Sequence, residues 1–317
     1  MAAVTPLDTM LHSLLTKSRK KLVMSYVKSN ALIAYMFASN RVETEDGGRN
    51  ITNPLISGRN PNVTSYSYYN SLPVAQTSEF KTVEYGWSRV AGTVIISDQE
   101  QDENQGEAAI FKVLTAKMQV LDESIQEKFS SYMYGAGPGV DPFGLEAAIP
   151  DNPTTGVFGG LSRATNNDWR TSAYDFATTL TSSNIEEAFD DILMDLTLRK
   201  ERPDVIIIGR DLYRIYRQAV RDKLVINLSE IKKDVVDLGF SGIAHDKIPI
   251  IYDEDCAANK AYFINSKYLR LHILKGVNMK VKQLSAPWNV DAVGRRTVWQ
   301  GQLCLWKAFR THGVVFN

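Results

Sequence analysis

The chain contains 317 residues, of which 44% are hydrophobic and 23% charged, and its 36 Lys and Arg residues balance 36 Asp and Glu residues. This composition is typical of a soluble globular protein with one large or two ordinary domains, and the zero net charge argues against a broad nucleic-acid-binding surface, which usually carries a basic excess. The start shows no signal-peptide pattern, the longest hydrophobic run (residues 31–38) is too short to cross a bilayer, and two cysteines, Cys256 and Cys304, exclude a disulfide framework and fit a reducing cytoplasm.

Residues 1–42 are predicted to form an N-terminal arm. Its leucines recur near helical spacing, at Leu7, Leu11, Leu14, Leu15 and Leu22. The same segment holds six cations and one acid, Asp8. Two interpretations stay open: the cations form a solvated helix face, or the arm lies against an acidic surface or a polyanion.

Residues 43–97 are unusual for a compact domain because they are rich in Gly, Asn, Pro and Ser. The tyrosines in the middle of this segment are Tyr66, Tyr68 and Tyr69. Near its end, alternation places Val83, Tyr85 and Trp87 on one face of a strand. We expect an extended loop that ends in a β-ribbon. Because isolated ribbons are marginally stable, another part of the chain or a neighbouring subunit must cover the aromatic face.

The clearest predicted element is a long helix over residues 105–134. Its hydrophobic residues follow steps of three and four: Ile110, Leu114, Met118, Leu121, Ile125, Phe129 and Tyr132. A helix of about 28 residues is a rod of roughly 40 Å. The run GAGPG at 135–139 ends it. These glycines follow a helix instead of a strand, which disfavours a phosphate-binding loop.

Residues 156–171, GVFGGLSRATNNDWRT, fit neither a helix nor a strand pattern. Gly159 and Gly160 would let the backbone turn, and Trp169 and Arg170 would fix the connection by packing and hydrogen bonding. We interpret the stretch as a joint between two parts of the fold. The sequence leaves open whether Trp169 and Arg170 act inside one subunit or against the next.

The second half of the chain alternates helices and strands without the regular rhythm of a doubly wound domain, which indicates an α+β fold. Helices are predicted within 182–200 and 210–220. Strands are predicted within 202–209, 247–253, 260–274 and 295–317.

The sequence predicts no catalytic, cofactor-binding or metal-binding residues. The four histidines are scattered, the cysteines lack CxxC spacing, and no Gly-x-Ser-x-Gly elbow occurs. The run DEDC at 253–256 could offer carboxylates to a metal, but no spaced histidine or acid completes a site, so it is interpreted as a solvated turn. These features disfavour an enzyme.

The order of the predicted elements resembles the major capsid protein of tailed double-stranded-DNA phages, which has the HK97-like fold. Four passages carry the resemblance: YMYGAGPGVDPFGLEAAI at the end of the long helix, GVFGGLSRATNNDWRT after it, and later RPDVIIIGRDLYRIYR and LGFSGIAHDKIPIIYDEDCAANKAYFINSKYLRL. Each is loose alone, but together they follow the family's order over nearly the whole chain.

The resemblance implies four regions. They are an N-terminal arm (1–42), an extended β-ribbon loop over a neighbouring subunit (43–97), a peripheral domain with the helix 105–134 as its spine (98–181 and 295–317), and an axial domain (182–294). Such subunits would self-assemble head to tail into pentamers and hexamers of an icosahedral shell around packaged double-stranded DNA. The candidate subunit-interface residues are Tyr66, Tyr68, Tyr69, Lys81, Trp169 and Arg170.

The resemblance also implies a structural protein of the virion, assembled in the host cytoplasm without a cofactor or a membrane. Its partners would be portal and decoration proteins and, weakly and non-specifically, the packaged DNA. Only residues 1–42 precede the loop, which predicts a separate scaffolding protein. No asparagine and acid partner can be placed for Lys81, so the Lys–Asn cross-link of some relatives is not carried over. Two alternatives stay open: an encapsulin-type nanocompartment shell and a soluble α+β enzyme.

Overall fold

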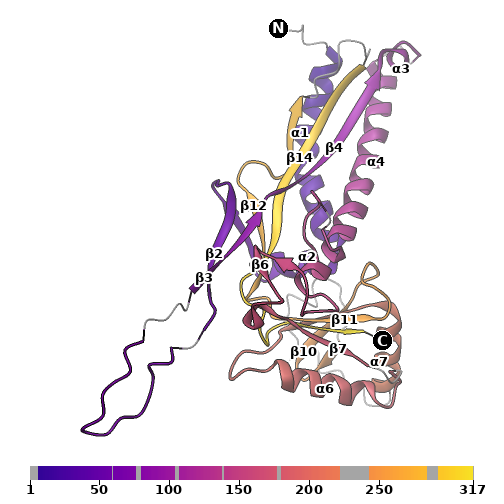
Figure 1. Ribbon diagram of the computed structural model, residues 1–317. Helices are drawn as coiled ribbons and strands as arrows, with labels where there is room; N and C mark the ends of the chain where they lie inside the picture. Colours follow the sequence, from indigo (N-terminus) through magenta and orange to yellow (C-terminus); the bar gives the residue numbers. More distant parts are fainter. Residues whose placement is uncertain are drawn as a thin grey trace.

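The computed structural model describes residues 6–58, 60–75, 80–103, 107–137, 139–176, 180–221, 243–283 and 292–316. These residues form an elongated lobe, a compact lobe at one end of it, and a long loop that projects away from both (Figure 1). Helices are combined with parallel and antiparallel strands, which confirms the predicted α+β class. No helix in the described ranges is both long and hydrophobic enough to cross a bilayer.

The elongated lobe combines helices with a five-stranded sheet. Its helices are α1 (Pro6–Ser29), α2 (Ala31–Ala38), α3 (Asp98–Glu103) and α4 (Glu107–Tyr134). Its strands are β1 (Val42–Glu45), β4 (Ser88–Ser97), β12 (Leu269–Leu274), β13 (Lys280–Gln283) and β14 (Ala292–Leu305). The long strand β14 organises the sheet, because it pairs antiparallel with β4, β12 and β13, while β1 runs parallel to β12.

Helix α4 is the long helix that the three-and-four spacing predicted. Its buried stripe consists of Leu114, Met118, Leu121, Ile125 and Phe129. This stripe joins the core shared with α1 and the sheet, where the Phe129 ring lies edge-on to Trp299 of β14 with the ring centroids 4.9 Å apart. The acidic run that the sequence places just before the helix forms the separate short helix α3.

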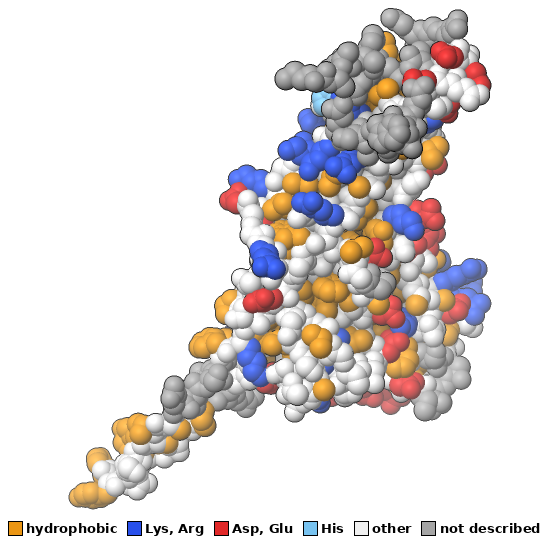
Figure 2. Space-filling model, turned by 45° about the horizontal axis from the view of Figure 1, so that its top comes forward, with side chains coloured by type: hydrophobic (Ala, Val, Ile, Leu, Met, Phe, Trp, Pro, Cys, Tyr) orange, Lys and Arg blue, Asp and Glu red, His pale blue; other side chains and the backbone are white. Residues whose placement is uncertain are grey.

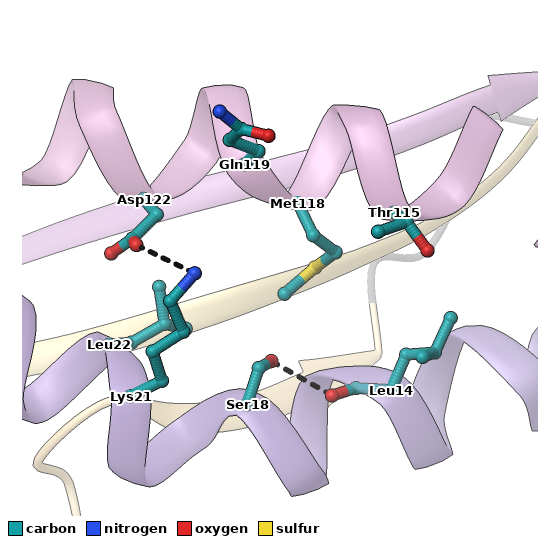
Figure 3. A pocket seen from close by; sticks show the side chains of 8 residues that line it. All are labelled: Leu14, Ser18, Lys21, Leu22, Thr115, Met118, Gln119 and Asp122. Carbon is teal, nitrogen blue, oxygen red and sulfur yellow. Dashed lines mark hydrogen bonds and ion pairs between the residues drawn. The ribbon is translucent and has the colours of Figure 1, made fainter. Parts of the chain in front are cut away.

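The predicted N-terminal arm begins as helix α1, which packs along α4, β13 and β14 (Figure 1). Its buried side includes Leu11, Leu15 and Leu22, whereas Lys17 and Lys20 are exposed. A pocket of about 200 Å³ remains between α1 and α4, and the Lys21 Nζ atom lies 3.4 Å from Asp122 Oδ2 beside it (Figure 3). Within this chain, α1 is therefore an amphipathic helix with exposed basic side chains, whereas α2 is largely buried.

The compact lobe is a six-stranded sheet with two helices. Its strands, in spatial order, are β7 (Ser172–Asp175), β15 (Gly313–Phe316), β11 (Lys260–Ile264), β8 (Val205–Ile208), β10 (Ile248–Tyr252) and β9 (Ala244–His245). Its helices are α6 (Ile185–Leu196) and α7 (Arg210–Val220). Alternation along β8 splits its side chains: Ile206 and Ile208 pack with α6 and α7, whereas Val205 and Ile207 join the core of the elongated lobe. One face of this sheet therefore packs in the core of the compact lobe and the other face in the core of the elongated lobe.

Strand pairing groups the chain differently from the predicted boundaries at several places. Strands β12 and β13 lie within 182–294 but belong to the sheet of the elongated lobe, as do β1 and β4 at the two ends of 43–97. Strand β15 lies within 295–317 and β7 within 98–181, but both belong to the compact lobe. The chain crosses between the sheets after β11 and again after β14. Hydrophobic periodicity marks a strand without indicating which sheet it joins, so the sequence could not show these crossings.

Candidate subunit interface

The extended loop is rooted by a two-stranded ribbon of β2 (Asn50–Ile56) and β3 (Phe80–Gly86), which pair antiparallel along their whole length. The buried residues of this loop root alternate along both strands: Ile51, Leu55, Val83 and Tyr85. They belong to the core of this chain. The alternation predicted for Val83 and Tyr85 is confirmed, and the chain itself supplies the surface that their face requires.

Tyr85 anchors the loop root. Its hydroxyl donates to the backbone oxygen of Leu305 at 2.7 Å and accepts from the Leu305 N–H at 3.2 Å. Its ring lies edge-on to Phe143, Phe158 and Trp306, with ring centroids 5.3–6.5 Å apart. Burial raises the pKa of Tyr85 well above its ordinary value, so the hydroxyl remains protonated and able to donate.

The glycine turn of the joint, residues 156–171, packs directly against the loop root. A short hairpin of β5 (Val157–Phe158) and β6 (Leu161–Ser162) brings the Gly159 carbonyl to 3.0 Å from the Glu84 N–H of β3. Gly159 has φ +57°, and a Cβ there would lie 2.3 Å from Val83 Cγ1. Both the backbone conformation and the close approach therefore require glycine at this position.

Trp169 and Arg170 contact other residues of the joint. Trp169 ends the short 3₁₀ helix η1 (Asn167–Trp169), and its Nε1–H donates to the Phe158 carbonyl at 2.8 Å while its ring stacks on that of Phe158. The Arg170 side chain donates to the carbonyls of Arg163 and Ala164 at 2.7 and 2.8 Å. Both side chains thus fix the connection from inside the subunit.

Arg163 is a joint residue that sequence reasoning missed. It is 5% exposed and donates from Nη2 to the carbonyls of Ala147 and Ala148 at the end of α5 (Leu145–Ala148). Its guanidinium lies 5.1 Å from the centre of the Phe158 ring, and burial lowers its pKa to about 10. A lone arginine within a polar loop is ordinarily solvated, so no sequence signal indicates its burial.

The far part of the extended loop, residues 57–75, is here called the loop tip. Its exposed hydrophobic side chains are Val63, Tyr66, Tyr68, Tyr69, Leu72 and Val74. Tyr68 and Tyr69 are fully exposed, at 100% and 101%. Local bonds hold its shape, including a pair in which the Asn62 side chain donates to the carbonyl of Ala75 and accepts from its N–H. Figure 2 shows hydrophobic side chains out to the end of this projection.

The predicted interface candidates therefore fall into two groups. The first group, on the loop tip, consists of Tyr66, Tyr68 and Tyr69. The second group lies at the loop root and the joint, where Lys81 Nζ donates to the Asn166 side-chain oxygen and where Trp169 and Arg170 contact their own chain. The fold brings the second group together and carries the first group away from both lobes (Figure 1).

The prediction of a solvated turn at 253–256 is wrong at two of its four residues. Asp253 is 5% exposed and Cys256 is 3% exposed. The Asp253 carboxylate accepts from the Ala31 N–H at 2.8 Å, which satisfies a free donor in the first turn of α2. Burial raises the pKa of Asp253, and it raises the pKa of the Cys256 thiol to about 12. Through Asp253 the turn thus makes a buried contact between the two lobes, while Glu254 and Asp255 are exposed.

Comparison of the sequence with protein-family models and with curated proteins finds no match. Solved structures do match the fold. A capsid chain of cyanophage A-1(L) is 16% identical with a TM-score of 0.64, and the match covers 89% of this chain and 91% of that one. A capsid chain of Myoviridae phage XM1 is 10% identical with a TM-score of 0.53 over 89% and 91%, and a capsid chain of an empty GTA particle is 12% identical with a TM-score of 0.52 over 88% and 95%. These matches confirm the predicted HK97-like capsid fold.

Proposed function

We propose that this chain, which has the fold of a tailed-phage capsid subunit, is a major capsid protein that self-assembles into pentamers and hexamers of an icosahedral shell around packaged double-stranded DNA. The observation that carries the proposal is the extent of the likeness: 89% of the chain matches 91% of a cyanophage capsid chain. Such a match includes the lobes and their connections, and it supports a structural role instead of an enzymatic one.

In this proposal the elongated lobe is the peripheral domain, with α4 as its spine, and the compact lobe is the axial domain. The axial domain takes most of 182–294 together with β7 and β15, whereas β12 and β13 go to the peripheral domain, as the strand pairing supports. Residues 1–42 are the N-terminal arm, and the extended loop is the part of 43–97 that lies between β1 and β4.

The loop tip is proposed to lie on a neighbouring copy of the chain. A contiguous row of exposed hydrophobic side chains is uncommon on a monomeric protein and is typical of an interaction site. A copy that offers its tip to the next one and receives a tip from the previous one makes a head-to-tail contact, which closes into rings. The loop root, covered by its own chain, would hold the tip in place before a partner binds.

Scaffolding, portal and decoration proteins are proposed as further partners on the resemblance alone, with assembly in the host cytoplasm and residence in the virion. Contact with packaged DNA is proposed to be weak and non-specific. The balance of 36 cations and 36 acids supports this, because affinity for DNA rises steeply with each neutralised phosphate.

The experiment that tests the proposal is expression of the untagged full chain followed by negative-stain electron microscopy and analytical ultracentrifugation. We expect rings of five or six subunits, or closed shells. A chain that remains a monomer at every concentration and salt condition tested, alone and in lysate of infected or induced host cells, would contradict the proposal. Uniform closed shells formed by the chain alone would remove the basis for a separate scaffolding protein.

The same experiment on a tip variant tests the proposed interface. Tyr68→Ser with Tyr69→Ser should leave the chain folded and prevent ring formation. The matched control is Met194→Ser on α6, which removes another side chain that is 71% exposed and should assemble normally. Normal assembly of the tip variant would show that the loop tip is not the contact.

A further inference from the structure

We propose that His272 and Glu43, with Glu45 orienting the imidazole, form a binding site for a divalent transition-metal ion, best suited to Zn²⁺, at the base of the extended loop. The three side chains come from neighbouring strands, since β1 runs parallel to β12 with Glu43 opposite His272. A carboxylate oxygen of each glutamate and a ring nitrogen of His272 lie within 4.8 Å of one another. The proposal is independent of whether the chain forms a shell.

His272 is the observation that points to an ion. Its side chain is 1% exposed, and its Nδ1 lies 3.0 Å from Glu45 Oε1. An ionised carboxylate can only accept, so Nδ1 carries a proton, and in the neutral imidazole Nε2 keeps its lone pair. Nε2 has no hydrogen-bond partner among the described residues. A buried imidazole with one nitrogen held by a carboxylate and the other free is the arrangement of a metal-ligating histidine.

The free Nε2 faces a second ligand across a gap of the right size. Glu43 Oε2 lies 3.6 Å from Nε2, too far for a hydrogen bond. Two ligands of a tetrahedral ion, each about 2.1 Å from the metal, stand about 3.4 Å apart. Glu43 uses its other oxygen, Oε1, to pair with Arg270, so Oε2 remains available. An ion between Nε2 and Oε2 therefore fits without displacing that pair.

The surroundings can complete the coordination. The site opens into a cavity of about 500 Å³ whose lining residues include Asn50, Thr52 and Asn53 at the start of the ribbon. The Trp306 ring, 5.0 Å from the imidazole and edge-on to it, fixes the plane of the ring. Two carboxylates and one guanidinium leave a net negative charge at the site, which favours a cation. Imidazole and carboxylate together suit Zn²⁺ better than Ca²⁺ or Mg²⁺, which prefer oxygen ligands alone.

The site lies where the extended loop leaves the sheet, so a bound ion would affect how the loop is attached. Glu45 is the last residue of β1, and β2 begins at Asn50, so the ion would tie the sheet to the point where the extended loop leaves it. Because the ion would bind only the folded chain, it would stabilise this attachment in proportion to its concentration. No sequence spacing could indicate the site, since His272 is separated from Glu45 by 227 positions.

The test is titration of the untagged, chelator-treated full chain with Co²⁺, followed by its visible absorption, and with Zn²⁺ by calorimetry. We expect one ion per chain and a visible band of low-symmetry Co²⁺. Glu43→Gln should weaken affinity at least tenfold, and Glu45→Gln about 10–100-fold, because it removes the group that orients the imidazole. His272→Gln should abolish the band.

The control is Asp46→Asn, which removes the same charge next to the site from a side chain that is 83% exposed and pairs with Lys275. It should bind as the unmodified chain does. If His272→Gln does not fold, Glu43→Gln decides, since its side chain is 37% exposed and its loss leaves the core intact. Absence of saturable binding to the unmodified chain, or equal affinity in Glu43→Gln, would overturn the proposal.

Discussion

The root and the tip of the extended loop use the same residue type in opposite ways. At the loop root, Tyr85 is fully buried, with its hydroxyl bonded to Leu305 and its ring among three other aromatic rings. At the loop tip, Tyr68 and Tyr69 are fully exposed. The difference lies in what each position can reach, because the root lies against the core and the tip projects beyond it (Figure 1).

The root contacts belong to the chain itself, whereas contacts of the tip with a partner are part of the proposed function. Burying one large hydrophobic side chain is worth roughly 1.5–3 kcal/mol. The chain gains this burial free energy at the root. At several positions of the tip the hydrophobic side chains stay in water, so the gain is not made within one chain. We infer that the root positions the loop and the tip binds, and the predictions below separate the two roles by their effect on the unassembled chain.

The largest expected effect is that of Tyr85→Ala. Removing a fully buried aromatic side chain should lower the free energy of unfolding of the unassembled chain by ~3–5 kcal/mol. Chemical denaturation followed by tryptophan fluorescence measures it. Tyr85→Phe keeps the ring and loses only the hydroxyl bonds to Leu305, so its effect should be about 1–2 kcal/mol. Equal effects of the two variants would show that ring packing contributes little.

The next largest effect is that of Gly159→Ala. A residue with a Cβ at φ +57° costs ~1–2 kcal/mol of backbone strain, and the contact with Val83 adds ~1–3 kcal/mol of overpacking. The control is Gly156→Ala, which has φ +85° but meets no atom within 4 Å, so only the strain remains. Denaturation of both variants measures the difference. If they are equally destabilised, the close approach between the joint and the loop root is not tight.

Local patterns in the sequence were enough for several of the longer elements of the fold. The three-and-four spacing predicted α4, and the alternation predicted the buried face of Val83 and Tyr85. The sequence could not predict how the strands divide between the two sheets, because hydrophobic periodicity does not show which strands pair with each other. The same limit applies to Asp253. An aspartate in a turn is usually solvated, but here its carboxylate is buried and accepts a hydrogen bond from the first turn of α2.

The candidate site was predictable only as a region. Exposed tyrosines in a Gly- and Asn-rich loop indicate a contact surface, and the glycines of 156–171 indicate a joint. The burial of Arg163 depends on the end of α5, and the meeting of Glu43 with His272 depends on two strands far apart in the chain. Such contacts arise from the tertiary fold, so no local pattern could have indicated them.

A smaller effect is expected for Lys81→Met. Lys81 is half-buried and donates to Asn166, so the loss of this bond between the loop root and the joint should cost ~0.5–1.5 kcal/mol in the unassembled chain. Lys128→Met, at an exposed position on α4, is the control and should change nothing measurable. If Lys81→Met leaves stability unchanged but alters assembly, Lys81 belongs with the tip as a contact to a neighbour.

The smallest effect on the unassembled chain is expected for the double variant Tyr68→Ala with Tyr69→Ala. Both side chains are fully exposed, so the free energy of unfolding should stay within about 0.5 kcal/mol of the unmodified value. Denaturation of the chain at a concentration too low for assembly measures this. The same variant should lose the extra stability that the unmodified chain gains on assembly, because that gain depends on tip side chains leaving water. A large destabilisation of the unassembled variant would mean that the tip folds onto its own chain in solution, and the contrast between root and tip would then fail.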